Sequence, residues 1–207
     1  VATKVGNPMG EAPNRSRYSR AWVLAECDAS LQRLGMDHVD IYYLHRDFNG
    51  MDLEEPLRAI DTLLRDGKIR YWGVSNFRGW RIAEMVSLAR TMNMPAPVVC
   101  QPYYNLLNRQ PEVEVLDVCA HHGIGVVPYS PIARGVLAGK YAPGSQPGQD
   151  TRAGRGGTLR GAVRRAVGLE AERHRPVEVG EVEVVVPRDL QLTRRARGAP
   201  GVLHADE

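Results

Sequence analysis

Residues 39–50 read VDIYYLHRDFNG, an apolar run that stops at a histidine followed by two charged residues. A nearly continuous apolar run of this length predicts a strand that is buried on both faces, as in a parallel sheet. His45 then lies at the carboxyl end of that strand. A polar side chain at such a strand end raises the question of what chemistry it serves there.

The triplet His45-Arg46-Asp47 matches the start of the protein-kinase catalytic loop, but the surrounding sequence excludes a kinase. That loop requires an asparagine five residues after its aspartate to hold a magnesium ion, and Asp52 occupies this position. The sequence also contains no Asp-Phe-Gly triplet, no Gly-rich phosphate loop and no Ala-Pro-Glu triplet. The histidine therefore needs another explanation.

Four further β-rich runs follow the same pattern and alternate with segments of helical period. They are VATKV (1–5), IRYWGVSN (69–76), VVCQPYYN (98–105) and GIGVVPYS (123–130). Counting 39–45, the five runs begin 25 to 38 residues apart, which is a regular length for a strand followed by a helix.

Residues 20–34 show the helical pattern clearly. Ser19 is a suitable N-cap and Gly35 a suitable end. The apolar residues form one stripe, namely Val23, Leu24, Cys27, Leu31 and Leu34. Segments 53–67, 81–93 and 113–123 repeat the pattern, and the first and last of these end at Gly67 and Gly123.

Alternating strands and helices predict either a doubly wound sheet or a (β/α)8 barrel. Polar residues recur at the carboxyl ends of the strands, namely His45, Ser75, Asn76, Gln101 and Ser130. Barrel enzymes build their sites at that rim, so this pattern favours the barrel. A full barrel needs about 250 residues. We therefore predict an α/β fold, a partial (β/α)8 TIM barrel of about five βα units.

The composition changes after Tyr141, which predicts a boundary there. Residues 142–207 contain no aromatic residue and no Ile, Met, Lys, Asn or Cys, and Arg and Gly are abundant. Such a segment buries little apolar area, so we predict a poorly ordered tail after a folded domain at 1–141. A frame-shifted translation of GC-rich DNA would give the same composition, and this alternative stays open.

The bulk properties limit the partners. The formal net charge is +3, and 43% of the 207 residues are hydrophobic. Three cysteines without a Cys-x-x-Cys pair favour a reducing, cytoplasmic location over a disulfide scaffold, and we expect no metal site. We expect no membrane span and no secretory signal. The segment RAGRGGTLRGAVRR (152–165) would suit nucleic acid, but it lacks interleaved aromatic residues, so we expect no nucleic-acid partner.

Residues 1–141 resemble the central part of an aldo-keto reductase. The matching pieces, in the family's order and spacing, are VATKV, SLQRLGMDHVDIYYLHR, LLRDGKIRYWGVSNF, QPYYNLLNR and GVVPYSPIARGVLAGKY. The resemblance implies a barrel that uses NADP(H) to reduce an aldehyde or ketone, a small carbonyl substrate. Some relatives are nicotinamide-sensing subunits of membrane channels, so a cofactor-binding regulatory subunit without rapid turnover is the alternative.

The resemblance implies catalytic roles for two residues. Lys4 matches the lysine whose charge lowers the pKa of the family's general-acid tyrosine, and His45 matches the histidine that orients the substrate carbonyl. A solvated strand-end lysine and a structural histidine are the alternatives. The family's Asp and Tyr precede Lys4 in the pattern and match no position here, so we expect an incomplete catalytic unit.

The resemblance also implies a set of cofactor contacts. Ser75, Asn76 and Gln101 match residues that hydrogen-bond the nicotinamide carboxamide, and Tyr129 matches the aromatic residue that stacks on the nicotinamide ring. Backbone N–H groups and cationic side chains of the next segment are expected at the pyrophosphate, and the residues are Ser130, Ile132, Arg134, Gly135 and Lys140. Structural alternatives are a Ser-Asn turn, a core tyrosine and a solvated arginine. The family's adenosine-phosphate motif has no match in the tail.

Overall fold

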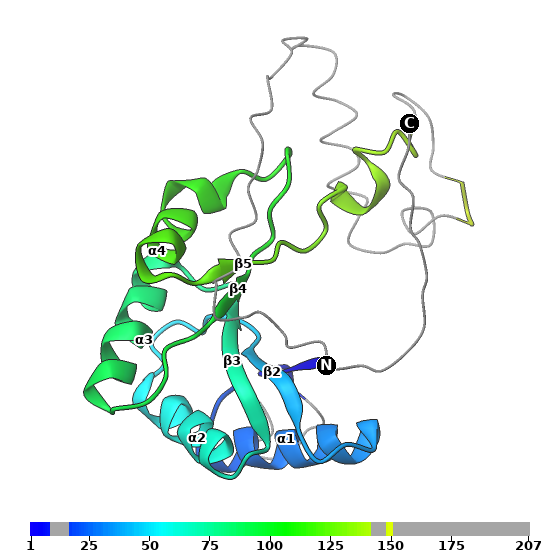
Figure 1. Ribbon diagram of the computed structural model, residues 1–207. Helices are drawn as coiled ribbons and strands as arrows, with labels where there is room; N and C mark the ends of the chain where they lie inside the picture. Colours follow the sequence, from blue (N-terminus) through cyan, green and yellow to red (C-terminus); the bar gives the residue numbers. More distant parts are fainter. Residues whose placement is uncertain (9–16, 142–147, 151–207) are drawn as a thin grey trace, which may run out of the picture.

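The computed structural model describes residues 1–8, 17–141 and 148–150. Within them, five parallel strands alternate with α-helices, and the strands lie in the order β1-β2-β3-β4-β5 (Figure 1). The elements are β1 (Ala2–Val5), α1 (Arg20–Leu34), β2 (Val39–Leu44), α2 (Glu54–Arg65), β3 (Ile69–Ser75), α3 (Gly79–Thr91), β4 (Val99–Gln101), η1 (Gln110–Val113), α4 (Val115–His122), β5 (Gly125–Val126) and η2 (Ala133–Gly135). The prediction for the tail after Tyr141 falls almost entirely outside the described residues.

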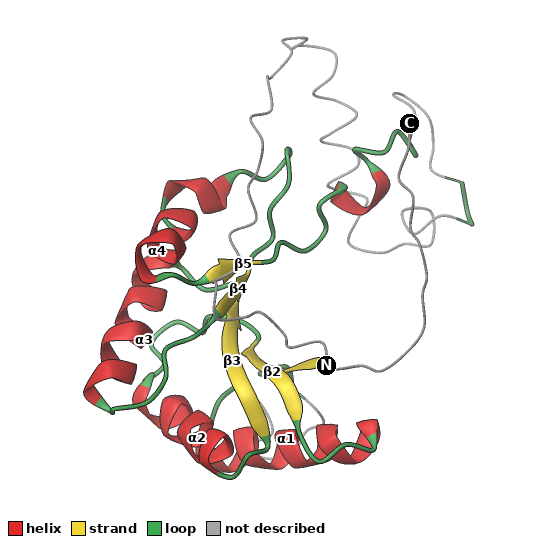
Figure 2. Cartoon of the chain, viewed as in Figure 1, coloured by secondary structure: helices red, strands yellow, loops and turns green. Residues whose placement is uncertain are grey.

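The helices α1 to α4 lie along one side of the sheet, as Figure 2 shows. Each strand connects to the next through a helix on this side, which is the arrangement of a βα barrel wall. The predicted α/β fold is confirmed, and the five parallel strands agree with a partial TIM barrel.

The parallel register divides the strand residues into two rows. One row, which we call the outer row, faces the helices and consists of Val5, Leu44, Val74, Cys100 and Val126. The other, the inner row, points to the opposite face and consists of Lys4, Tyr43, Gly73, Val99 and Gly125. Directly paired residues in a parallel sheet point to the same face, so the two rows separate the core from the face that carries the polar strand ends.

The outer row and the helices enclose the hydrophobic core. Leu44, Val74 and Cys100 are fully buried, and they pack in one cluster with apolar side chains of all four α-helices. Burying one such aliphatic side chain stabilises the fold by about 1.5–3 kcal/mol.

Two hydrogen bonds from buried aromatic residues tie strands to neighbouring segments. Tyr42 donates to the Val23 carbonyl of α1 at 3.2 Å, and the Trp72 indole donates to the Pro95 carbonyl at 2.8 Å.

The predicted ends of α1 are confirmed. The Ser19 hydroxyl accepts a hydrogen bond from the Trp22 N–H, and Gly35 takes the left-handed conformation at φ 64°. Within the predicted stripe, Val23, Cys27 and Leu31 are buried. Leu34 is instead 45% exposed, because the helix ends at this residue.

The last two strands are shorter than the sequence predicts. Runs 98–105 and 123–130 form regular strands only at Val99–Gln101 and Gly125–Val126. Pro102 and Pro128 follow within two residues of these ends. Proline has no N–H to donate to a ladder, so beyond it only an isolated parallel bridge between Tyr103 and Tyr129 continues the pairing.

Gly73 of the inner row should not tolerate a side chain. A Cβ atom there would lie 2.5 Å from the Val99 carbonyl oxygen and 3.0 Å from Cε1 of Tyr43. We expect Gly73→Ala to lower the free energy of unfolding by about 1–3 kcal/mol, as overpacking does. Urea unfolding followed by tryptophan fluorescence measures it. Arg65→Ala, on the exposed side of α2, is the control and should change the stability by no more than about 0.5 kcal/mol; equal stability of the two variants would contradict the close packing.

Candidate active site

The carboxyl ends of the five strands bring the predicted site residues to one rim. Parallel strands end at the same edge of a sheet, and barrel enzymes place their chemistry there. Hydrogen bonds join the neighbouring strand ends across this edge: Ser75 Oγ donates to the Gln101 carbonyl at 2.8 Å, and the His45 N–H donates to the Val5 carbonyl at 3.0 Å. These bonds join β3 to β4 and β1 to β2 at the edge where His45, Ser75 and Gln101 lie.

Asn76 connects three parts of this rim. Its Nδ2 donates to the His45 carbonyl at 3.0 Å and to Ser75 Oγ at 2.9 Å. Its Oδ1 accepts the Tyr129 hydroxyl hydrogen at 2.8 Å. The backbone of Asn76 is left-handed with φ 58°, a conformation that asparagine tolerates better than most residues. One side chain thus links β2, β3 and the segment after β5.

Lys4 and His45 lie on the same face of the sheet. The Lys4 ammonium lies 5.1 Å from the centroid of the Tyr43 ring, its partner in the inner row. The half-buried imidazole of His45 makes no hydrogen bond to the described residues. Its pKa is lowered by burial and then by the positive charges of Lys4 and Arg46. At neutral pH the imidazole is therefore uncharged and able to donate one N–H.

Two tyrosines beside this rim are not activated as acids. Burial raises the pKa of Tyr43, and it raises the pKa of Tyr18 more strongly. The Tyr18 hydroxyl donates to the Arg46 carbonyl and accepts from the Arg46 N–H, both at 2.7 Å. Tyr18 thus holds the backbone that follows His45 and does not supply a proton.

A cavity of about 340 Å³ opens beside Asn76 and Tyr129. Tyr103 forms part of its wall, and the ring centroids of Tyr103 and Tyr129 are 5.3 Å apart with the rings tilted by 32°. Tyr129 is half-buried, and burial raises the pKa of its hydroxyl. The half-buried side chain of Gln101 makes no hydrogen bond to the described residues. Its amide remains able to bind a ligand.

The segment predicted to contact the pyrophosphate continues directly from Tyr129. Ser130 and Arg134 are left-handed, with φ 57° and 58°, and Gly135 has φ 102°. Ile132, Arg134 and Lys140 are exposed. Lys140 packs its aliphatic chain near Gly135, where an added Cβ would lie 3.2 Å from Lys140 Cδ. The phosphate-binding role of this segment stays a prediction.

Several residues that shape the rim were not among the predicted site residues. The alternation of side chains along a strand could have indicated Tyr43, which lies two residues before His45 and so shares its face. Tyr103, two residues after Gln101, could have been found in the same way. Tyr18 and Asp47 act through contacts with residues about 30 positions away, which no local pattern reveals.

Neither a metal site nor a membrane-spanning helix is found in residues 1–8, 17–141 and 148–150. No group of three or more His, Cys, Asp or Glu side chains there could hold a metal ion. No helix in these same ranges has the length and apolar character needed to cross a membrane. Cys27, Cys100 and Cys119 are buried free thiols.

The model of the aldo/keto reductase family matches residues 1–179. The chain belongs to this family. The match places the strand ends described above within the aldo/keto reductase part of the chain.

Curated relatives within the family include enzymes and channel subunits. The chain is 38% identical to the L-glyceraldehyde 3-phosphate reductase of Escherichia coli (strain K12) over 158 residues, which cover 76% of this chain and 45% of the relative. It is 39% identical to a probable voltage-gated potassium channel subunit beta of Oryza sativa subsp. japonica over 139 residues, covering 67% and 42%. It is 37% identical to the aflatoxin B1 aldehyde reductase member 2 of Mus musculus over 119 residues, covering 58% and 32%. The chain spans less than half the length of these relatives.

The pKa of His45 offers a direct test of the rim's electrostatics. We expect an imidazole titration followed by NMR to show a midpoint below 6.5. Lys4→Met should raise the midpoint, because it removes a nearby positive charge. The folded-state pKa of His45 lies below its unfolded value, so protonation of the imidazole favours the unfolded state. The free energy of unfolding should therefore decrease as the pH falls below about 6.5.

Lys68→Met is the matched control for that titration. Lys68 precedes β3 at the opposite end of the sheet and pairs with Asp28 at 2.6 Å, so its loss should leave the His45 midpoint unchanged. A midpoint that responds equally to both lysine variants would show that Lys4 has no special place beside the imidazole.

Proposed function

We propose that this chain carries the nicotinamide-facing rim of an NADPH-dependent reductase of aldehydes or ketones. The observation that supports it most is the junction at Asn76, which links His45 to Tyr129 while the amide of Gln101 stays available nearby. A hydrogen-bond donor for a carbonyl, an aromatic face and the unengaged amide of Gln101 thus lie at one end of a parallel sheet.

The side chains present suit a nicotinamide. Its carboxamide offers one acceptor and two donors, and Gln101 can satisfy both kinds. Asn76 Oδ1 already accepts from Tyr129, but a carbonyl oxygen has a second lone pair for an amide N–H. The exposed part of the Tyr129 ring offers an apolar face for stacking. The donor set and the adjoining cavity of about 340 Å³ therefore fit this part of the cofactor.

His45 is the residue that would orient the substrate. Its neutral imidazole can donate an N–H to a carbonyl oxygen and so stabilise the negative charge that develops there during reduction. The Lys4 ammonium adds a positive charge on the same face, which would lower the pKa of a general-acid phenol; Tyr43, whose pKa burial raises, does not provide that acid. NADPH, when bound, supplies the hydride.

The positively charged segment after Tyr129 would hold the cofactor's phosphates. Ser130, Ile132 and Gly135 would act through their backbone N–H groups, and Arg134 and Lys140 through their charges. The charge of Arg134 already acts on Tyr129, since it opposes the rise in the pKa of that hydroxyl. A cytoplasmic location with abundant NADPH belongs to the same proposal.

A second candidate function is a regulatory subunit that binds the cofactor without rapid turnover. It is favoured by the similarity to a probable potassium channel subunit beta, which matches 67% of this chain. The two functions share one cofactor site and differ only in turnover. Turnover therefore separates them.

The test begins with NADPH binding to the 207-residue chain, measured by fluorescence titration. We expect Tyr129→Ala to weaken binding by about tenfold or more, because loss of an aromatic stacking partner costs about 1–3 kcal/mol. Tyr129→Phe keeps the ring and should lose less. Tyr71→Ala, on the same face but near the amino end of β3, is the control and should bind as the unchanged chain does.

Turnover is then measured as NADPH oxidation with a panel of aldehydes and ketones. The protein used for this measurement is the one that the gene encodes. Turnover of at least one carbonyl compound supports the reductase, and binding without any turnover supports the regulatory subunit. An NADPH affinity that is absent, or equally weakened by Tyr71→Ala and Tyr129→Ala, would contradict both.

A further inference from the structure

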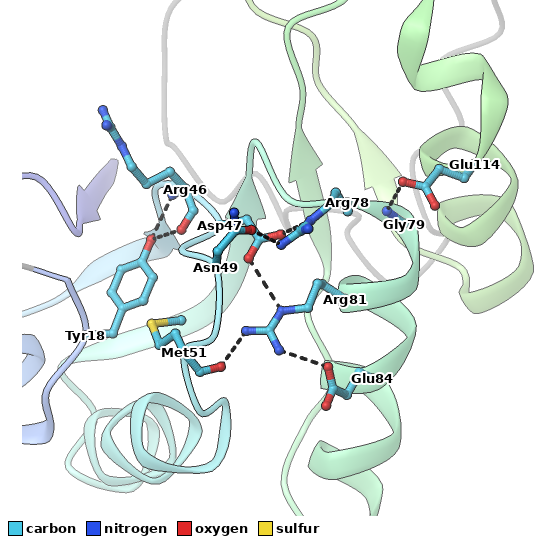
Figure 3. Close-up of polar contacts among 10 residues, drawn as sticks. All are labelled: Tyr18, Arg46, Asp47, Asn49, Met51, Arg78, Gly79, Arg81, Glu84 and Glu114. Atoms are coloured by element: carbon cyan, nitrogen blue, oxygen red, sulfur yellow. Dashed lines mark hydrogen bonds and ion pairs between the residues drawn. The ribbon is translucent and has the colours of Figure 1, made fainter.

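Two arginines at the start of α3 hold the segment that follows β2, as Figure 3 shows. Arg78 Nε donates to Asp47 Oδ2 at 2.6 Å, and its Nη2 donates to Asn49 Oδ1 at 2.8 Å. Arg81 Nη2 donates to the Met51 carbonyl at 2.7 Å. We call Asp47, Asn49, Met51, Arg78 and Arg81 the arginine clasp.

The centre of the clasp is a buried ion pair. Arg81 Nε lies 3.4 Å from Asp47 Oδ1, and the two side chains are only 8% and 6% exposed. Burying two charges costs free energy that their attraction offsets only with good geometry and further hydrogen bonds. Arg81 has these further bonds, to Met51 and to Glu84 at 3.0 Å. Asp47 Oδ1 and Arg81 Nε themselves have no hydrogen-bond partner within the described residues, so this contact is weak evidence for added stability.

The clasp is directly connected to the candidate site. Besides its carboxylate contacts, Asp47 donates its backbone N–H to the Asn76 carbonyl at 3.3 Å. Asn76 in turn donates its side-chain N–H to the His45 carbonyl at 3.0 Å. Asp47 follows His45 by two residues, and Arg78 follows Asn76 by two. The same two strand ends are thus joined once at the site and again just behind it.

We propose that Asp47 and Arg81 are positioning residues that fix His45 and Asn76 relative to each other at the rim. Neither side chain reaches the rim itself; each acts through the backbone that carries a site residue. Asp47 joins the turn after β2 to the turn after β3 through its backbone N–H. Arg81, on α3, contacts the carboxylate of Asp47 and donates to the carbonyl of Met51. The link to cofactor binding rests on the proposed function, whereas the link to the geometry of Asn76 does not.

The neighbouring contacts support a positioning role for this segment. Tyr18 binds the N–H and the carbonyl of Arg46, so the two peptide bonds that flank Arg46, the residue before Asp47, are held from another direction. Arg78 also lies 5.0 Å from the centroid of the exposed Trp80 ring, which keeps its guanidinium over the first turn of α3. Residues 45–51 are thereby fixed at several points although they form no regular element.

The test compares Asp47→Asn and Arg81→Lys with Glu84→Gln. Asparagine keeps the size of Asp47 but removes its charge. Lysine keeps the charge of Arg81 but cannot contact Asp47 and the Met51 carbonyl together. Glu84 is the exposed partner of Arg81, with 45% of its side chain accessible, so Glu84→Gln disturbs the same arginine without touching the buried pair.

Two measurements are made on each variant of the 207-residue chain. The first is the NMR signal pair of the Asn76 side-chain amide without nucleotide, which reports its bonds to His45 and Ser75. The second is the affinity for NADPH. We expect Asp47→Asn and Arg81→Lys to shift the Asn76 signals, speed their hydrogen exchange and weaken NADPH binding by about tenfold, the effect of one lost hydrogen bond to a charged group. Glu84→Gln should change neither.

Each outcome bears on the proposal. Unchanged Asn76 signals in a folded Asp47→Asn or Arg81→Lys variant would overturn it, and so would loss of folding in both, since the pair would then serve folding and not the site. If only one of these two variants folds, its Asn76 signals and its NADPH affinity decide the outcome. If the unchanged chain does not bind NADPH, the proposed function fails, while the Asn76 signals still show whether the clasp positions the rim.

Discussion

Parallel pairing in a single register joins Lys4, Tyr43, Gly73, Val99 and Gly125 into one row across all five strands. The neighbouring row, buried under the helices, consists of apolar residues. Because strand side chains alternate between faces, a slip of one residue would send the outer row out of the core and Lys4 into it. The burial of the outer row therefore fixes the face on which the polar strand ends appear. This register therefore determines which strand residues can reach the candidate site, whichever hydrogen bonds they form there.

The electrostatics of the rim follow from the same arrangement. Lys4 and Arg46 both lower the pKa of His45, and Arg46 and Arg134 both act on the pKa of Tyr129. Several positive charges thus converge where the strands end. Such a concentration of one sign of charge raises the local concentration of anionic ligands, which suits a cofactor that carries phosphates. The negative charge of Asp47 is instead neutralised behind the rim by Arg78 and Arg81.

Sequence patterns predicted the features that depend on neighbouring residues. The βα alternation, the cap at Ser19 and the left-handed turn at Gly35 follow from periodicity and local backbone preferences. The same reasoning places His45, Ser75 and Gln101 at strand ends, whereas the roles that the family resemblance implies for them stay predictions. The short β4 and β5 were missed because an apolar run does not show that Pro102 and Pro128 interrupt its hydrogen bonds.

Contacts between distant segments could not be predicted in this way. The histidine-arginine-aspartate triplet at 45–47 suggests chemistry for its aspartate, yet Asp47 forms ion pairs with arginines more than 30 residues away. The role of Asn76 as a junction likewise depends on Tyr129, 53 residues later. Such pairings follow from the stacking of βα units in space, and a single sequence carries no direct signal of them.

The central claim is that the carboxyl ends of the strands form the nicotinamide site, and intermolecular NOEs between bound NADPH and the chain test it most directly. The account predicts NOEs from the nicotinamide ring protons to the Tyr129 ring and to the Gln101 side-chain amide. NOEs from the nicotinamide to residues at the amino ends of the strands, near Lys68 and Arg70, with none to Tyr129 or Gln101, would contradict it.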